Sequence, residues 1–427
     1  MLRRKVFTLS NGLRVVTAAQ RHLHRAALAL VSRAGSLYES EEDNGLSHFV
    51  EHMLFRGTRE HPGHYEFHKE VEDLGGSLQA VTYCDHTVYE LFLPPANVVA
   101  GIALLGELVR GPLFAGLDLE REVIRAELLD DLDEDGNDRS PDTRVRRLLF
   151  PGHPYGWPVA GPPDRPDRFG LRDCKRFVAR HFTGHNLVLA AAGPIDPEAV
   201  ARAAHRALGG VPAGEPVALP KAPAPRRGIV FEHLPEPGAS RVEVRIDLLA
   251  PGRASPLSAG LQVLLRTLDD GMATRLHRRV VDERGLAYEV FAEIDPVGDL
   301  GVLEVGGACA PEKGVAYVAE LVKILRGLAD RAPSETEVRR ARRRYVWELE
   351  ATTDDSRAIA AWFGEAELAG LGRDLSERVE QIRAVTRRDV RDVARSILSG
   401  AGAAVTGGDL RMLERRKVKR LLAGLTS

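Results

Sequence analysis

A segment rich in proline and glycine near the middle of the chain most constrains how the sequence can fold. Residues 209–227 begin Gly-Gly-Val-Pro-Ala-Gly and end Lys-Ala-Pro-Ala-Pro-Arg-Arg. Proline lacks the backbone donor that helices and central strands use, so this composition is typical of a semi-rigid linker. A chain of 427 residues is also long for a single hydrophobic core. We therefore expect one domain over residues 1–210, a linker over 211–227 and a second domain over 228–427.

The two halves share a local pattern. Residues 67–80 can be laid on residues 276–289, because each stretch has the pattern of a short amphipathic helix, a glycine exit and a strand. An internal similarity of this kind indicates a duplicated domain.

Strands are predicted before helices. Apolar residues alternate over 6–16, 26–32 and 241–249, as in half-buried strands. Helical periodicity occurs in seven later stretches: residues 119–132, 173–181, 197–208, 311–329, 334–352, 356–371 and 386–398. Elements that are grouped rather than alternating predict an α+β fold, with two similar domains that each consist of an antiparallel sheet with helices packed on it.

Composition excludes several classes of protein. The 59 basic and 61 acidic residues give a formal net charge of −2, so no broad positive field exists to attract nucleic acid or anionic lipid. No run approaches the roughly 18 apolar residues of a membrane span, and no apolar segment follows the basic N-terminus. The cysteines (Cys84, Cys174 and Cys309) form no CxxC pair and are expected to be reduced. We expect a cytoplasmic protein that binds neither nucleic acid nor membrane.

The strongest functional signal is the stretch His-Phe-Val-Glu-His at residues 48–52. On a helix, His48 and His52 stand four apart and project from one face toward a single ion. Glu51 shares that face. This is the H-x-x-E-H pattern, in which two histidines bind Zn²⁺ and the glutamate acts as general base. A buried helix with two histidines four apart by chance would give the same letters, so the motif needs a second signal.

That signal lies in residues 120–127, Glu-Arg-Glu-Val-Ile-Arg-Ala-Glu, where Glu120 and Glu127 share one helix face two turns apart. A catalytic zinc site with two histidines needs one more protein ligand and one open position. By themselves, two glutamates seven residues apart are typical of a solvated helix face.

At this point the sequence resembles the pitrilysin/insulinase family of zinc metallopeptidases, which includes mitochondrial processing peptidase and small bacterial peptidases. In that family the third zinc ligand is a glutamate in a helix of the pattern Glu-Arg-x-Val-Ile-x-x-Glu, and Glu127 lies 75 residues after His52. The resemblance implies His48, His52 and Glu127 as zinc ligands, Glu51 as general base, and Glu120 as an acidic residue that orients the site. It also implies that the two domains form a half-clam and that two such chains enclose a chamber.

The likeness extends over nearly the whole chain. Residues 78–89 resemble the family's strand whose exposed edge pairs with the substrate backbone, which implies Ala80, Val81 and Thr82 as substrate-binding residues. Gln79 stands where the family usually has Asn. Further family segments are matched by residues 153–161, 271–276 and 284–288.

One departure from the family lies in the second half. Members that complete the site within one polypeptide usually carry an Arg seven residues before a signature Tyr, and both engage the substrate. Tyr288 is present as a substrate-binding residue, but position 281 is Val281. The chain therefore resembles the zinc-bearing subunit of a small bacterial heterodimer, whose metal-free homologue supplies the Arg/Tyr pair. Arg278 or Arg279 could substitute, although on a helix they point elsewhere.

The sequence thus predicts a zinc endopeptidase subunit that hydrolyses short or unfolded peptides and needs a homologous metal-free partner. An autonomous homodimeric peptidase would have to work without Arg at position 281. A non-catalytic scaffold subunit would have no need of a desolvated His-His-Glu cluster. A metal-independent hydrolase has less support, because no G-x-S-x-G motif is present.

A neighbouring stretch contains His61, His64 and His68. Their spacings suit a helix, but Pro62 and Gly63 break it at the start. We interpret all three as surface histidines rather than as a second site.

Overall fold

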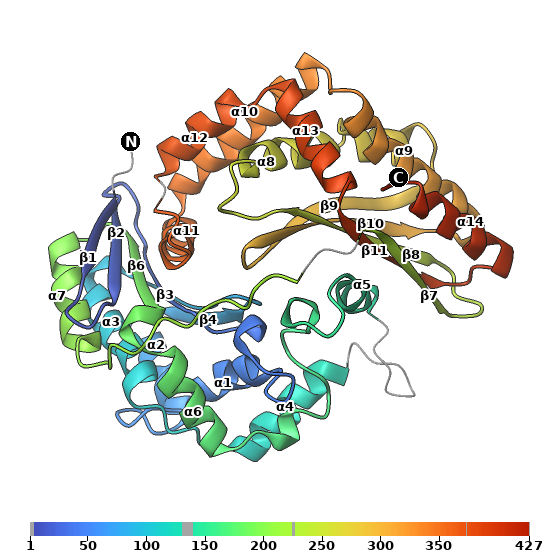
Figure 1. Cartoon of the computed structure of the whole chain (residues 1–427). Helices are drawn as coiled ribbons and strands as arrows, with labels where there is room; N and C mark the ends of the chain where they lie inside the picture. The colour runs from blue at the N-terminus through green and yellow to red at the C-terminus, as the bar shows by residue number, and fades with distance from the viewer. Residues whose placement is uncertain (1–3, 130–139, 224–226, 373, 427) are drawn as a thin grey trace. The chain divides into compact units, whose positions relative to one another are not determined.

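The computed structural model describes residues 4–129, 140–223, 227–372 and 374–426. The chain divides into two compact units (Figure 1). Unit 1 comprises Met1–Asp130, Pro158–Pro220 and Leu349–Glu377, and unit 2 comprises Asp131–Trp157, Lys221–Glu348 and Arg378–Ser427. Between helix α7 and strand β7, the described residues 211–223 form neither helix nor strand, in keeping with their prolines.

Unit 1 contains a six-stranded sheet in the order β1-β2-β6-β3-β5-β4. Its strands are β1 (Arg4–Thr8), β2 (Arg14–Ala19), β3 (Ala26–Ser32), β4 (Ser77–Thr82), β5 (Thr87–Leu93) and β6 (Leu187–Gly193). Unit 2 contains a five-stranded sheet in the order β7-β11-β8-β10-β9. Its strands are β7 (Gly228–Pro235), β8 (Val242–Pro251), β9 (Ala287–Val297), β10 (Leu300–Cys309) and β11 (Ala401–Gly408).

The two sheets have the same topology. Taken in order, β7-β11-β8-β10-β9 repeats β2-β6-β3-β5-β4, and the pairs β2/β6 and β7/β11 are both parallel while the other pairs are antiparallel. This agreement bears out the two similar α+β domains expected from the sequence.

The prediction of wholly antiparallel sheets was wrong, because one pair in each sheet is parallel. Strands β2 and β3 run in opposite directions, and β6 lies between them. A strand inserted between two antiparallel strands must be parallel to one of them. Strand β6 follows them by more than 150 residues, so no local pattern in the sequence announces the insertion.

Helices cover both faces of the unit 1 sheet. One face packs Leu28, Leu30 and Leu91 against residues such as Phe49 and Met53, and the opposite face packs Ala29 and Val31 against Ile359 and Phe363. Because both faces are covered, β3, β5 and β6 are buried along their whole length.

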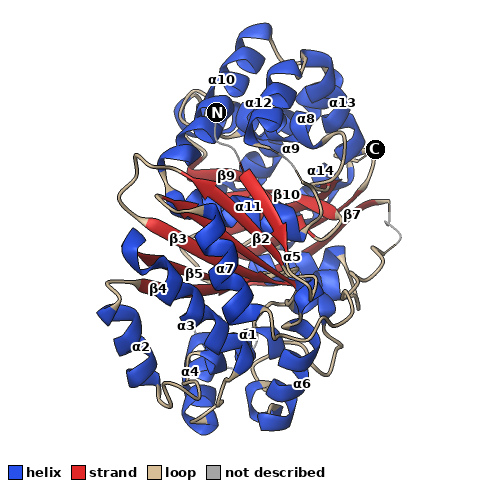
Figure 2. Ribbon diagram, turned by 90° about the vertical axis from the view of Figure 1, so that its left-hand side faces the viewer, coloured by secondary structure: helices blue, strands red, loops and turns tan. Residues whose placement is uncertain are grey.

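The helices of unit 1 include α1 (Leu46–Leu54), α2 (His64–Asp73), α3 (Val98–Arg110), α4 (Leu117–Leu129), α6 (Leu171–His181), α7 (Pro197–Leu208) and α11 (Ser356–Leu368). Those of unit 2 include α5 (Pro141–Leu149), α8 (Ser258–Leu268), a π-helix η6 (His277–Asp282), α9 (Gly314–Asp330), α13 (Arg387–Leu398) and α14 (Met412–Ala423). Helices α10 (Glu335–Ala351) and α12 (Leu375–Ala384) cross the division between the units. Figure 2 shows helices against the strands of both sheets.

Each unit includes one helix from the other half of the sequence. Helix α5 packs on β11 and β8, while α11 packs on β3 and β6. The close approach of α11 requires Gly364, since a Cβ there would lie 2.8 Å from Val31 Cγ2.

All seven predicted helical stretches contain a helix, although residues 130–132 of the first lie outside the described part. All three cysteines are free, and no described helix is long and apolar enough to cross a membrane.

Candidate metal centre

Helix α1 is amphipathic, and a partly buried carboxylate binds the backbone at its start. Glu39 accepts hydrogen bonds from the backbone N–H groups of Gly45 (2.9 Å) and Ser47 (2.7 Å), which are unpaired donors at a helix N-terminus. Burial raises the pKa of Glu39, although these hydrogen bonds act in the opposite direction. Gly45 has φ of +98°, and a Cβ there would lie 2.6 Å from the carbonyl oxygen of Ala160. The family-like segment that ends at Gly161 therefore packs directly against the start of α1.

Three side chains of α1 and α4 converge. Nε2 of His48 lies 3.5 Å from one carboxylate oxygen of Glu127, and Nε2 of His52 lies 3.6 Å from the other. The two imidazole ring centroids are 4.7 Å apart. One ligand atom from each residue lies within 4.8 Å of the others, and no other three His, Cys, Asp or Glu side chains converge this way in the described part of the chain.

The spacing of these atoms fits a zinc ion. Two ligand atoms of a tetrahedral zinc, each bonded at about 2.0–2.2 Å, lie about 3.4 Å apart. The separations of 3.5 and 3.6 Å are close to that value. The Glu127 side chain is 52% exposed, which leaves one side of the group open for a further ligand.

The charge of the surroundings also fits a divalent cation. Glu51 and Glu120 are buried, and Glu120 lies 3.5 Å from the guanidinium of Arg56. With neutral imidazoles, the three carboxylates of Glu51, Glu120 and Glu127 against one guanidinium leave two negative charges, which one Zn²⁺ would neutralise. Buried charge without such a partner is costly.

Glu120 orients His52. Because a carboxylate only accepts, His52 Nδ1 donates to Glu120 Oε1 (2.8 Å), and Nε2 keeps its lone pair for a metal. Burial acts to lower the pKa of His52, but the hydrogen bond to Glu120 and the charges of Glu51 and Glu127 outweigh it and raise that pKa. The contact with His48 lowers the pKa of Glu127 despite its partial burial.

Glu51 is held from the end of β4. The Thr82 hydroxyl donates to Glu51 Oε2 at 2.6 Å, which leaves Oε1 for another partner. The buried Tyr89 lies in the same environment: burial, and then the charge of Glu51, raise its pKa well above the usual range.

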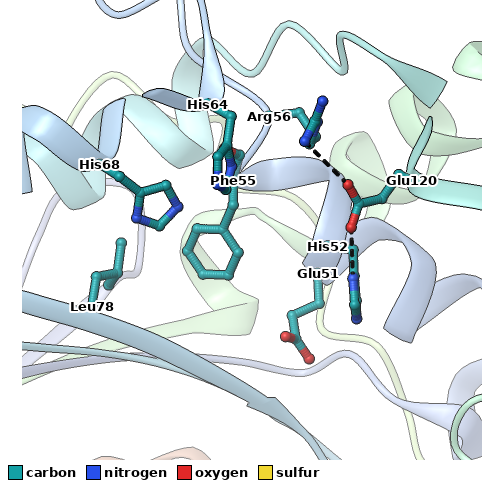
Figure 3. A pocket seen from close by; sticks show the side chains of 8 residues that line it. All are labelled: Glu51, His52, Phe55, Arg56, His64, His68, Leu78 and Glu120. Atoms are coloured by element: carbon teal, nitrogen blue, oxygen red, sulfur yellow. Dashed lines mark hydrogen bonds and ion pairs between the residues drawn. The ribbon is translucent and has the colours of Figure 1, made fainter. Parts of the chain in front are cut away.

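A cavity of about 270 Å³ adjoins the group of His48, His52 and Glu127, called here the metal group (Figure 3). Figure 3 shows the ring of Phe55 between Glu51 on one side and His68 and Leu78 on the other. The cavity is lined by Glu51, His52, Phe55, Arg56, His64, His68, Leu78 and Glu120.

The three histidines after the motif are placed differently from one another. Helix α2 starts at His64, so Pro62 and Gly63 do separate His61 from it as expected. His61 is partly buried and lies 2.9 Å from Glu107. His64 is exposed, as predicted, whereas His61 and His68 are only partly exposed, and His64 and His68 line the cavity.

The second-half residues belong to unit 2. Tyr288 is 74% exposed on the edge strand β9, and Val281 lies in the π-helix η6. Arg279 pairs with the buried Glu320 (3.0 Å) and with Glu283, and Arg278 also pairs with Glu283. Both arginines are thus engaged by glutamates within unit 2.

Two contacts escaped sequence reasoning. Thr82 was expected to act through its backbone, yet its hydroxyl contacts Glu51. Arg56 follows His52 by four residues, and this helical spacing was the signal that could have indicated its contact with Glu120.

Residues 14–158 match the family described as Insulinase (Peptidase family M16), and residues 168–345 match the Peptidase M16 inactive domain. The chain is 30% identical over 406 residues to an uncharacterized zinc protease of Mycobacterium tuberculosis, which is 94% of this chain and 92% of that relative. The chain belongs to the M16 family of zinc proteases. The resemblance drawn from the sequence motifs is thus confirmed.

Other M16 relatives and similar structures cover almost all of the chain. The beta subunit of the mitochondrial-processing peptidase of Dictyostelium discoideum is 26% identical, with 94% of this chain and 88% of that protein covered. The crystal structure of a protease from Helicobacter pylori has a TM-score of 0.87 at 20% identity and covers 95% of this chain and 100% of that one. A chain of complex III2 from Candida albicans has a TM-score of 0.80 at 18% identity, with 97% and 99% covered. These two structures share the fold.

Proposed function

We propose that this M16 chain is a zinc-dependent endopeptidase subunit that hydrolyses short or unfolded peptides inside a closed chamber. The observation that carries the proposal is the convergence of His48, His52 and Glu127, with Glu51 beside them in a cavity. The zinc proteases among its relatives support it.

The side chains have distinct proposed roles. His48, His52 and Glu127 would hold a zinc ion, which would act as a Lewis acid and lower the pKa of a bound water to about 7. Glu51 accepts the proton of the attacking water at its carboxylate and then delivers it to the leaving amine. Thr82 fixes one oxygen of Glu51, and Glu120 fixes the ring of His52.

Strand β4 is the proposed binding edge for the substrate backbone. It is the last strand of its sheet and pairs only with β5 among the described strands. An extended peptide that adds to this edge would hydrogen bond with Ala80, Val81 and Thr82. Because Thr82 also contacts Glu51, the edge and the base are directly connected.

The residues of unit 2 are the reason for proposing a partner subunit. Tyr288 is available at the surface, but Val281 supplies no cation, and Arg279 is engaged by Glu320. A metal-free homologue with an Arg/Tyr pair would provide the missing cationic contact to the substrate, which positioning alone cannot replace. The M16 relative named as a subunit of mitochondrial-processing peptidase supports a two-subunit enzyme.

The test compares peptide hydrolysis by the chain alone, by the chain with such a homologue, and by Val281→Arg, with mass in solution measured for each. We expect weak activity alone and a strong rise with the homologue. Robust turnover by the isolated chain, unchanged by any partner, would replace the heterodimer with a homodimeric peptidase. A zinc-loaded chain that is inactive in every combination would point to a scaffold subunit.

A further inference from the structure

The cavity beside the metal group has a second pair of histidines at its other end. His64 and His68 line it together with Phe55 and Leu78. Figure 3 shows His68 and Leu78 on the far side of the Phe55 ring from Glu51, and His64 beside Phe55. Neither the motif nor the proposed mechanism uses these two histidines.

This pair repeats the geometry of the first. His64 and His68 are four residues apart on α2, as His48 and His52 are on α1. Their ring centroids are 4.3 Å apart, against 4.7 Å for the α1 pair. Two histidines at this helical spacing can bind a single metal ion.

The hydrogen bonding of the His64 ring and the pKa of the His68 ring both favour metal binding. The Phe55 carbonyl oxygen can only accept, so His64 Nδ1 donates to it at 3.0 Å and Nε2 keeps its lone pair. A ring N–H donated to a backbone carbonyl is the usual orientation of a metal-binding histidine. Burial, and then His64 in its protonated form, lower the pKa of His68, while the charge of Glu72 acts in the opposite direction. His68 is thus neutral near pH 7, as a ligand must be.

We propose that His64 and His68 form a second site for a divalent transition-metal ion such as Zn²⁺, weaker than the first, and that its occupation inhibits the enzyme. The site is weaker because no third His, Cys, Asp or Glu of the described residues completes it. Imidazole nitrogens favour zinc, copper and nickel over magnesium or calcium.

Inhibition follows from the position of the site. An ion held by His64 and His68 places two positive charges and its own water molecules in the cavity that also contains Glu51. A substrate side chain and the ion then compete for the same space. This consequence rests on the proposed function, whereas the binding of the ion does not.

The binding test is a calorimetric titration of Zn²⁺ into the whole chain after removal of bound metal. Wild type should show one tight and one weaker binding event. His64→Gln and His68→Gln should each weaken the second event by at least about 10- to 100-fold, the loss typical of a residue that merely orients a ligand. His61→Gln is the matched control, because His61 is in the same stretch but contacts Glu107.

The tight event reports folding in every variant, and His64 is exposed, so His64→Gln keeps the test decisive if His68→Gln does not fold. A wild type without a second event, or a second event that persists in both variants, would overturn the site. If the tight event is missing from wild type, the proposed zinc centre fails instead, and the two failures are distinguishable.

The functional test is the ratio of peptide hydrolysis at one equivalent of Zn²⁺ to that in excess Zn²⁺. We expect excess zinc to reduce the activity of wild type and His61→Gln several-fold and to have less effect on His64→Gln. Equal inhibition of all three proteins would overturn the inhibitory role. An altered preference for the substrate side chain in His64→Gln, with no change in zinc binding, would show a substrate pocket instead.

Discussion

Units 1 and 2 share one sheet topology, but different charged groups join neighbouring helices in each unit. In unit 1, α1 and α4 meet through two imidazoles and the Glu127 carboxylate, with a surplus of negative charge around them. Helices α8 and α10 meet through the guanidinium of Arg266, which lies 3.6 Å from the centre of the Tyr345 ring and donates to Glu348 at 2.6 Å.

The comparison shows that, within the described part of the chain, a His/His/Glu group forms in unit 1 and has no counterpart in unit 2. Between α8 and α10 the chain supplies its own positive charge, and no metal group forms there among the described residues. In unit 1, Arg56 balances only part of the charge of three carboxylates. The group of His48, His52 and Glu127 in unit 1 and Arg266 in unit 2 are thus two different ways of joining neighbouring helices.

The largest expected effect separates chemistry from metal binding in unit 1. In Glu51→Gln the zinc should remain and peptide hydrolysis should fall by about 10²- to 10⁴-fold, because an amide cannot accept the proton of the water. Turnover and zinc content should be measured on the same samples. Full activity in this variant would remove Glu51 from the mechanism.

The second prediction is that two buried groups, one in each unit, make stability depend on pH in opposite directions. Burial lowers the pKa of His181 in unit 1 to about 4, despite its hydrogen bond to the carbonyl of Arg33. Its unfolded form binds more protons between pH 6.5 and 4, so unit 1 should lose up to about 3 kcal/mol as the pH falls through this window. Burial raises the pKa of Asp247 in unit 2 to about 8 against the effect of Arg146, so unit 2 should lose stability as the pH rises from about 4 to 8.

Peptide-resolved hydrogen exchange between pH 4 and 8 can follow the units separately. His181→Gln should flatten the pH dependence of β6, because its amide can still donate but does not titrate, and Asp247→Asn should flatten that of β8. If hydrogen exchange in β6 and in β8 depends on pH in the same way, and neither substitution changes this, the prediction of opposite effects is contradicted.

The third prediction concerns the charge that joins α8 and α10. Arg266→Met should destabilise unit 2 by about 2 kcal/mol, through loss of the cation–π contact and of the part-buried hydrogen bonds of the guanidinium. Arg266→Lys should recover part of this, because it keeps the charge but not the planar stack. Thermal unfolding and zinc content should both be measured for wild type and for the two Arg266 variants. Loss of zinc in Arg266→Met with no loss of stability would break the distinction between the two units.

The smallest effect on hydrolysis is expected from loss of the hydrogen bond between Thr82 and Glu51. Thr82→Val should reduce hydrolysis by about 10-fold, equivalent to one hydrogen bond to a charged group. Thr82→Ser retains the hydroxyl and serves as the control. If the serine variant is as impaired as the valine variant, the contact with Glu51 does not matter for activity.

Local sequence patterns were sufficient to predict most of the fold and most of the group of His48, His52 and Glu127. The spacing of His48, Glu51 and His52 on one helix needs no tertiary information, and Glu127 could be assigned only because its helix resembled that of a known family. Helix α5 was missed although Ser140 caps it and Pro141 occupies its first turn, a recognisable start signal.

Long-range packing supplied the features that the sequence did not predict. The insertion of β6 between β2 and β3, the packing of α11 on the unit 1 sheet, and the contact of Thr82 with Glu51 all join segments distant along the chain. No periodicity within any one of these segments specifies which partner it will meet.

The most direct test of the zinc centre is elemental analysis of the dialysed wild type beside His48→Ala, His52→Ala and Glu127→Ala. The account predicts about one tightly bound zinc per chain in wild type and its loss from all three variants, because two remaining ligands cannot maintain a tetrahedral site. Arg266→Met should retain the zinc. Wild-type zinc content in all three ligand variants would contradict the assignment.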